Sequence, residues 1–113
     1  MNLDKYNFVF GLGFLKEINK RYVIKHDGVE VKAGLETILP NLANSDVETL
    51  LEVLKIANQT EKEKASYAEL ERIITEAEDI EGLFEEVLGA LEESNFTAIK
   101  AKRFMKVVRN QKG

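Results

Sequence analysis

The spacing of apolar residues changes once along this chain, and that change limits the folds it can adopt. After residue 33 apolar residues recur three and four positions apart, which places them on one face of an α-helix. The clearest stripe follows Asp79 and consists of Ile80, Leu83, Phe84, Val87, Leu88 and Leu91. Before residue 33 part of the pattern alternates with the period of two that a strand requires. We therefore expect an α+β fold that is mainly α, with a small N-terminal β element (a strand or a hairpin) packed on a bundle of about four to five amphipathic helices.

The first 33 residues predict the β element and one short helix. Tyr6, Phe8 and Phe10 alternate along residues 5–10, so a strand there would place all three rings on one face. Two glycines, Gly11 and Gly13, then let the chain turn into a helix whose apolar residues are Phe14, Leu15, Ile18 and Tyr22. Farther on, the Asp-Gly pair at 27–28 favours the tight turn of a hairpin over residues 23–31. A plain surface loop is the alternative for that segment.

Helix-start signals divide the rest of the chain. Ser45 with Glu48, and Ser66 with Glu69, each form a capping box, and Asp79 caps a third helix. A shorter amphipathic segment over residues 35–42 is disturbed by Pro40, which cannot donate to residue 36. The last helix is predicted from Phe96 to Arg109. The apolar stripes after the two serine caps are Val47, Leu50, Leu51, Leu54 and Ala57, and then Tyr67, Leu70, Ile73, Ile74 and Ala77.

No linker long enough to divide the 113 residues is present, so we expect one domain over residues 1–113. Residues 1–33 would form the β element and first short helix, residues 34–94 the helical body, and residues 95–113 a basic C-terminal helix. Charge follows this division: residues 61–93 carry 12 acidic and 3 basic side chains, whereas residues 95–113 carry 6 basic and no acidic ones. The basic helix could dock onto its own acidic body, onto a protein partner, or onto another copy head to tail.

Catalytic and cofactor chemistry has little support in the sequence. The chain has no cysteine, and His26, its one histidine, lies beside a predicted turn, where a solvated side chain is the ordinary interpretation. Gly11-Leu12-Gly13 occupies the place of a dinucleotide fingerprint, but Lys16 stands where the third glycine belongs. We therefore expect no enzyme activity, no cofactor and no metal. No apolar run approaches the roughly 20 residues that cross a bilayer, and the N-terminus lacks a signal peptide, so we expect no membrane contact and a cytoplasmic location.

The six cations of residues 95–113 raise one alternative function, a small nucleic-acid-binding or regulatory module that uses the C-terminal helix. The remaining sequence argues against it. The protein is acidic, with a pI near 5.1, and no recognition helix follows helix-turn-helix spacing. Binding through this helix alone would be weak and strongly dependent on salt.

Two segments carry a recognisable motif. In the first, an aromatic strand runs into a Phe-Gly-x-Gly-Phe-Leu-x-Glu-hydrophobic-Asn element, and the second opens the helix after residue 79. The residues are Phe8, Phe10, Gly11, Gly13, Phe14, Leu15, Glu17, Ile18 and Asn19 in the first segment, and Asp79, Ile80, Leu83 and Phe84 in the second. Both segments resemble the tail assembly chaperones of long-tailed bacteriophages and prophages of Gram-positive bacteria, the second being similar to the family's characteristic C-terminal helix. Relatives often carry a further strand before the aromatic one, whereas four residues, 1–4, precede it here.

The resemblance implies a binding protein without catalysis. Such chaperones keep the long, helical tape measure protein in solution in the host cytoplasm, are displaced as tail tube subunits assemble, and are absent from the finished virion. A longer product of programmed frameshifting commonly adds a domain that recruits tube protein. The family motifs consist of packing residues, so the resemblance assigns them a structural role.

Partner contact is expected from apolar residues that a helix does not need for its own packing. Val53 and Ile56 flank the main stripe of the helix after residue 46, and Met105 extends that of the last helix. The alternative is that such residues complete the core. In the last helix Lys100 and Arg103 fall in the same sector as the apolar residues. The candidate partner-binding residues, for a client or for self-contact, are Phe96, Ile99, Lys100, Arg103, Phe104, Val107 and Val108.

Overall fold

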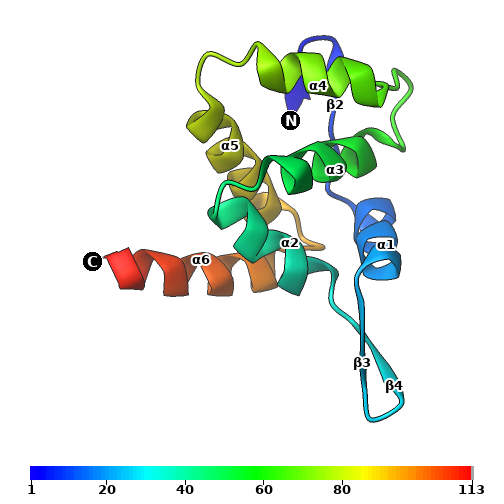
Figure 1. The fold of residues 1–113 in the computed structure, drawn as a ribbon, viewed down its shortest axis with the longest axis vertical. Coiled ribbons are helices and arrows are strands. Elements are labelled where there is room, and N and C mark those ends of the chain that lie inside the picture. The colour runs from blue at the N-terminus through cyan, green and yellow to red at the C-terminus, as the bar shows by residue number, and fades with distance from the viewer. Residues whose placement is uncertain (113) are drawn as a thin grey trace.

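The computed structural model describes residues 1–112, which form six helices and two small antiparallel sheets of two strands each (Figure 1). The chain is mainly α with a small β element, as the sequence predicts. The elements are β1 (Asn2–Leu3), β2 (Tyr6–Asn7), α1 (Leu12–Arg21), β3 (Val23–His26), β4 (Val29–Lys32), α2 (Gly34–Ala43), α3 (Val47–Asn58), α4 (Tyr67–Thr75), α5 (Ile80–Glu93) and α6 (Ala98–Lys112).

The N-terminal sheet is shorter than expected and contains a strand that the sequence did not predict. β1 pairs with β2 through Asn2–Asn7 and Leu3–Tyr6, so the first four residues do contain a strand. The predicted strand over residues 5–10 ends at Asn7, because the next amides bond elsewhere: Phe8 donates to the carbonyl of Met1 and Val9 to that of Ala57 in α3, each at 2.8 Å. The alternation is confirmed, since all three rings are buried and Val9 is exposed.

The second sheet confirms the hairpin. Asp27 and Gly28 both have positive φ, 52° and 78°, as a tight two-residue turn between β3 and β4 requires. All eight residues of the two strands are exposed, and the hairpin projects from the rest of the molecule (Figure 1). The hairpin therefore forms as predicted but does not pack on the helices.

The core lies where α1, α2, α3 and α5 meet, and the three rings of the aromatic N-terminal segment are part of it. The stripe of α5 is buried as predicted, except that Ile80 is half-buried. Helix α2 continues through Pro40 without a break, contrary to the expected disturbance. Val53 and Ile56 are buried, so their prediction as spare positions is wrong: α3 packs against α1, α2 and α4, which leaves little of its surface free.

Helix α4 differs from its prediction at both ends. Tyr67, expected on the buried side, is exposed because its hydroxyl donates to Glu52 at 3.1 Å and its ring faces the Lys55 ammonium, 5.2 Å from the ring centroid. At the other end the helix stops at Thr75, so Ala77 lies beyond it.

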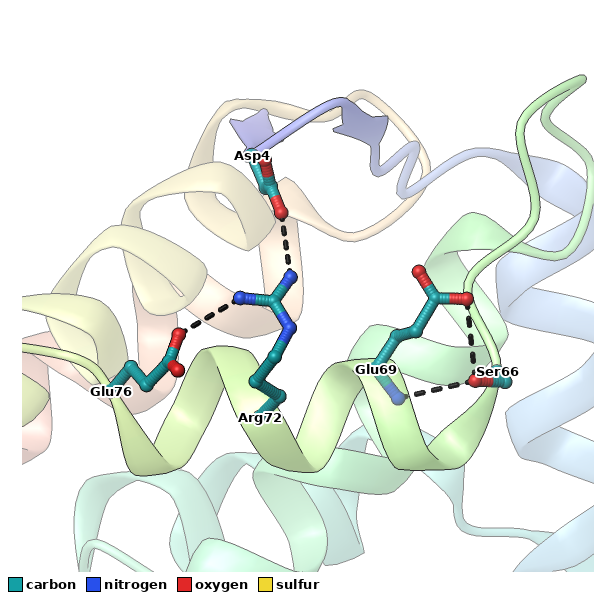
Figure 2. A network of polar contacts seen from close by, with 5 residues as sticks. All are labelled: Asp4, Ser66, Glu69, Arg72 and Glu76. Carbon is teal, nitrogen blue, oxygen red and sulfur yellow. Dashed lines mark hydrogen bonds and ion pairs between the residues drawn. The ribbon is translucent and has the colours of Figure 1, made fainter.

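Two of the three predicted helix caps are confirmed. Ser66 Oγ accepts from the Glu69 amide at 3.1 Å (Figure 2), and Asp79 Oδ1 accepts from the Gly82 amide at 2.9 Å. At α3 the prediction is wrong by one residue, because Asp46 is the cap and accepts from the amides of Glu48 and Thr49. Ser45 precedes the cap with a positive φ of 61°. A carboxylate is also the better cap electrostatically, since it faces the positive end of the helix dipole.

The side chain of Asn58, at the end of α3, joins three segments. Asn58 is buried, and its amide nitrogen donates to the carbonyls of Asn7 and Glu63, each at 2.9 Å. Its carbonyl oxygen accepts from the Ala65 amide at 2.7 Å. One buried amide thus fixes the N-terminal segment and the connector between α3 and α4 to the same helix end.

Gly34 stands at a close contact between α1 and α2. Its amide donates to Asn19 Oδ1 at 3.1 Å, which gives the family-motif asparagine its structural role. A Cβ at this position would lie 2.7 Å from both Asn19 Oδ1 and Ile18 Cγ1, and 3.0 Å from the Ile18 carbonyl carbon. The two helices can approach this closely because residue 34 has no side chain.

In residues 1–112 none of the helices has the length and apolar character needed to span a membrane. The same residues contain no cluster of three or more histidine or carboxylate side chains that could hold a metal ion.

Gly34→Ala should lower the free energy of unfolding by ~1–3 kcal/mol, because the added methyl group must displace α1 backbone and Ile18. Chemical denaturation measures the change. Gly89→Ala in α5 is the matched control, since its Cβ would meet nothing within 4 Å, and it should raise stability by about 0.5–1 kcal/mol. Equal effects of the two substitutions would contradict the close contact.

Asn58→Leu should lower the free energy of unfolding by at least about 2 kcal/mol, because it leaves a buried amide and two carbonyls without their partner. Gln59→Leu, at the neighbouring exposed position, should change stability by no more than about 0.5 kcal/mol. Denaturant unfolding of both variants provides the measurement. A small loss at position 58 would show that the three segments hold together without this side chain.

Candidate functional site

Helix α6 is anchored at its start and lies across α5 and α2. The Thr97 hydroxyl donates to the carbonyl of Leu91 at 2.6 Å, and Ser94 Oγ, in the preceding turn, donates to the carbonyl of Phe10. Ala101 is fully buried against the body. The helix begins at Ala98, later than predicted, because residues 94–97 form the turn that makes these bonds. Phe96 therefore lies in the turn and not in the helix.

The candidate partner-binding residues of α6 do not form one surface. Phe104 and Val108 are half-buried on the face toward the body, where Val108 lines a depression with Leu42 and Phe84. Ile99 and Val107 lie on the outer face and are 66% and 56% exposed. Arg103 lies between them at helical spacing, and we call Ile99, Arg103 and Val107 the outer stripe. The inward residues serve packing, and the outer stripe is free for contact.

Two cations of the C-terminal segment are engaged with the protein's own carboxylates. Lys100 pairs with Glu36 of α2 at 2.6 Å, and Arg109 pairs with Glu92 of α5 at 3.0 Å. Partial burial raises the pKa of Glu36, but the hydrogen bond from Lys100, a backbone hydrogen bond and the Lys100 charge outweigh it, so this pKa is below its ordinary range. The contribution of this pair to stability is present at neutral pH and is lost as acid protonates Glu36.

The three remaining described cations of α6 are not paired in this way. Over residues 1–111, Lys102, Arg103 and Lys106 are exposed and form no ion pair. The basic helix thus docks partly onto its own body, one of the arrangements that the charge pattern allows, and keeps positive charge beside the outer stripe.

A shallow apolar groove lies between the N-terminal segment and the turn before α6. We call it the N-terminal groove; its volume is about 460 Å³, and Val9, Phe10, Ala90 and Phe96 contribute apolar lining. Val9 and Phe96 are 40% and 50% exposed, so two large apolar side chains face solvent here. Of these, Phe96 was a candidate and Val9 was not. The signal for Val9 is its place in the alternation, on the face opposite the buried rings.

The other family-motif residues of the N-terminal segment are mostly buried. Phe8, Phe10, Phe14 and Ile18 are buried, and Leu15 is half-buried. Gly11 precedes α1 with an ordinary negative φ of −95°, so this glycine is not required for backbone geometry.

At Gly13 a Cβ would lie 3.1 Å from Cγ2 of Thr60, a tight contact with an exposed side chain. Glu17 pairs with Arg21 one turn on, at 3.6 Å. In α5, Asp79 caps the helix, and Leu83 and Phe84 enter the core.

A family model described as phage tail assembly chaperone protein matches residues 1–106. Neither a curated protein nor a solved structure matches the chain. The family match covers the β element, the N-terminal groove, all of α5 and the outer stripe except Val107. The chain therefore belongs to the phage tail assembly chaperone family.

Proposed function

We propose that this chaperone binds the tape measure protein of its phage and keeps it in solution in the host cytoplasm until tail tube subunits assemble around it. It then leaves and is absent from the virion. The role requires no chemical step, cofactor or metal. A longer frameshifted product, where one is made, would recruit the tube subunits.

The observation that carries this proposal is the N-terminal groove in a protein of this family. A helical client exposes apolar stripes until the tube encloses it, and such stripes aggregate in water. Val9 and Phe96 offer exposed apolar surface in a shallow depression, the arrangement that accepts the apolar face of a helix. A shallow contact also suits a complex that must later come apart.

The walls of the groove are held by hydrogen bonds. The Val9 amide donates to Ala57 of α3, the Thr97 hydroxyl donates to Leu91 of α5, and Ser94 Oγ joins the two walls by donating to the carbonyl of Phe10. Both walls are therefore in place before a client arrives, which reduces the ordering cost of binding. Glu93 also lines the groove, and its charge favours solubility of the complex.

The nucleic-acid alternative has less support. Lys100 and Arg109, two of the six cations on which it depended, are held by Glu36 and Glu92. Each pair places a carboxylate beside the helix that would have to approach phosphate groups, and this lowers its attraction for them.

Val9→Asp combined with Phe96→Asp should weaken tape measure binding at least about tenfold, because each change places a charge on the apolar groove. The measurement is the amount of soluble tape measure protein that co-purifies after co-expression. Val47→Asp is the matched control: Val47 is 47% exposed at the start of α3, outside the groove, and should leave the yield unchanged.

The thermal unfolding of both variants, measured beforehand, separates loss of binding from loss of fold. A folded double variant that still yields the wild-type amount of soluble client would refute the groove as the client site.

A further inference from the structure

A second depression in the surface combines apolar side chains with carboxylates. It lies where the β1–β2 turn meets the end of α4 and the start of α5, and its volume is about 390 Å³. We call it the acidic depression. Its apolar lining includes Leu3, Ile73 and Leu83, and its carboxylates include Asp4, Glu78 and Glu86.

The acidic depression and the N-terminal groove lie end to end along one side of α5. The cap Asp79 lines the first together with Leu83 and Glu86, and Ala90 lines the second together with Glu93. These five positions follow one another at spacings of four, three, four and three, which places them on one side of a helix. We call this row of five residues the α5 seam. The N-terminal segment also lines both depressions, so it borders the seam at both ends.

The seam carries negative charge that the protein leaves largely uncompensated. In the described part of the chain, no lysine or arginine lines either depression. Arg72 of α4 does pair with Asp4, at 2.7 Å (Figure 2). Glu86 and Glu93 are exposed and, over the same described residues, form no ion pair. Lys102 of α6 lines a neighbouring depression with Glu93, so Glu86 is the less compensated of the two.

We propose that one helix of the client lies along the α5 seam and carries lysine or arginine residues seven positions apart, opposite Glu86 and Glu93. The inference rests on the proposed function and names the client segment, an amphipathic helix with cations beside its apolar stripe. The two carboxylates are seven residues apart in α5, or about 10.5 Å of helical rise, and two turns of a client helix span the same distance. The apolar lining at both ends of the seam receives the client's apolar stripe.

Charge and continuity both favour the client as the occupant. The seam extends the N-terminal groove, where the client is proposed to bind, so one helix can contact both depressions. A row of carboxylates attracts a basic helix and repels the phosphate groups of a nucleic acid. The two charges also fix the register of the bound helix, which apolar contact alone leaves undefined because it has no direction.

Overlapping synthetic peptides that cover the tape measure protein identify the segment. Their binding to the intact chaperone is measured by fluorescence anisotropy. The peptides that bind should share an apolar helical stripe and two basic residues seven positions apart, and their affinity should fall as salt is added. Binding confined to peptides without such a pair would overturn the proposal.

Glu86→Lys tests the part of the seam that lies outside the N-terminal groove. It should lower the affinity for the best-binding peptide at least about fivefold, because it replaces an attraction with a repulsion. Glu85→Lys is the matched control: the adjacent residue is exposed, undergoes the same charge change and lines neither depression of the seam. Its affinity should stay within about twofold of the wild type, since salt screens charges that are not in contact.

Reversing a charge on the peptide separates pairing from a structural effect of the substitution. Each of the two basic residues of the peptide is changed to glutamate in turn. One of these changes should weaken binding to the wild type and restore binding to Glu86→Lys. Wild-type affinity in Glu86→Lys, or restoration by neither peptide, would overturn the seam and leave the N-terminal groove as the client site.

Cross-linking with the full-length client gives a measurement that does not depend on peptides. A photoreactive benzoylphenylalanine in place of Glu86, in chaperone co-expressed with the tape measure protein, should form an adduct with the client. The same group in place of Glu85 should form little. An adduct with a second copy of the chaperone instead, or equal yields at the two positions, would overturn the proposal, whereas failure of the Val9 and Phe96 variant to affect binding would count against the N-terminal groove alone.

Discussion

The burial of the extended aromatic segment from Tyr6 to Phe10 is the constraint on which the rest of the structure depends. Its three rings are almost completely inaccessible to solvent. Its backbone is bonded to Met1, to α3 through Ala57, and to the turn before α6 through Ser94. Amphipathic helices alone can pack in several arrangements, because apolar contact has no direction. A central segment with fixed hydrogen bonds on both sides selects one arrangement, and it leaves Val9 facing outward at the N-terminal groove.

The parts of the fold that sequence predicts well are those set by local pattern. The stripe of α5, the Asp-Gly hairpin and the caps at Ser66 and Asp79 depend on residues within a few positions of one another. The parts of the fold that the sequence did not predict depend on residues far apart along the chain. A two-residue strand such as β1 has no periodicity to detect, and the role of Asn58 requires carbonyls from two other segments.

The same limit on prediction from sequence applies within helix α6. Sequence identifies which residues of α6 are apolar, but the direction of the helix decides which of them meet α5 and α2. Phe104 and Val108 face the body, whereas Ile99 and Val107 do not. Arg103, in the row of Ile99 and Val107, was the available signal that this row faces solvent, whereas Lys100 shares the row of Phe104 and Val108 and reaches Glu36 of α2. Phe96 belongs to neither group, because residues 94–97 form a turn before the helix begins.

A chaperone that must later be displaced benefits from contacts that are individually weak and separate in space. The N-terminal groove proposed for the client fits this requirement, because it is shallow and exposes two large apolar side chains, Val9 and Phe96. The Val9 amide is bonded to α3, and Ser94 joins the turn before α6 to the N-terminal segment, so the groove would bind a client with little ordering of the chaperone. A contact that costs little ordering can form and break repeatedly without unfolding the chaperone.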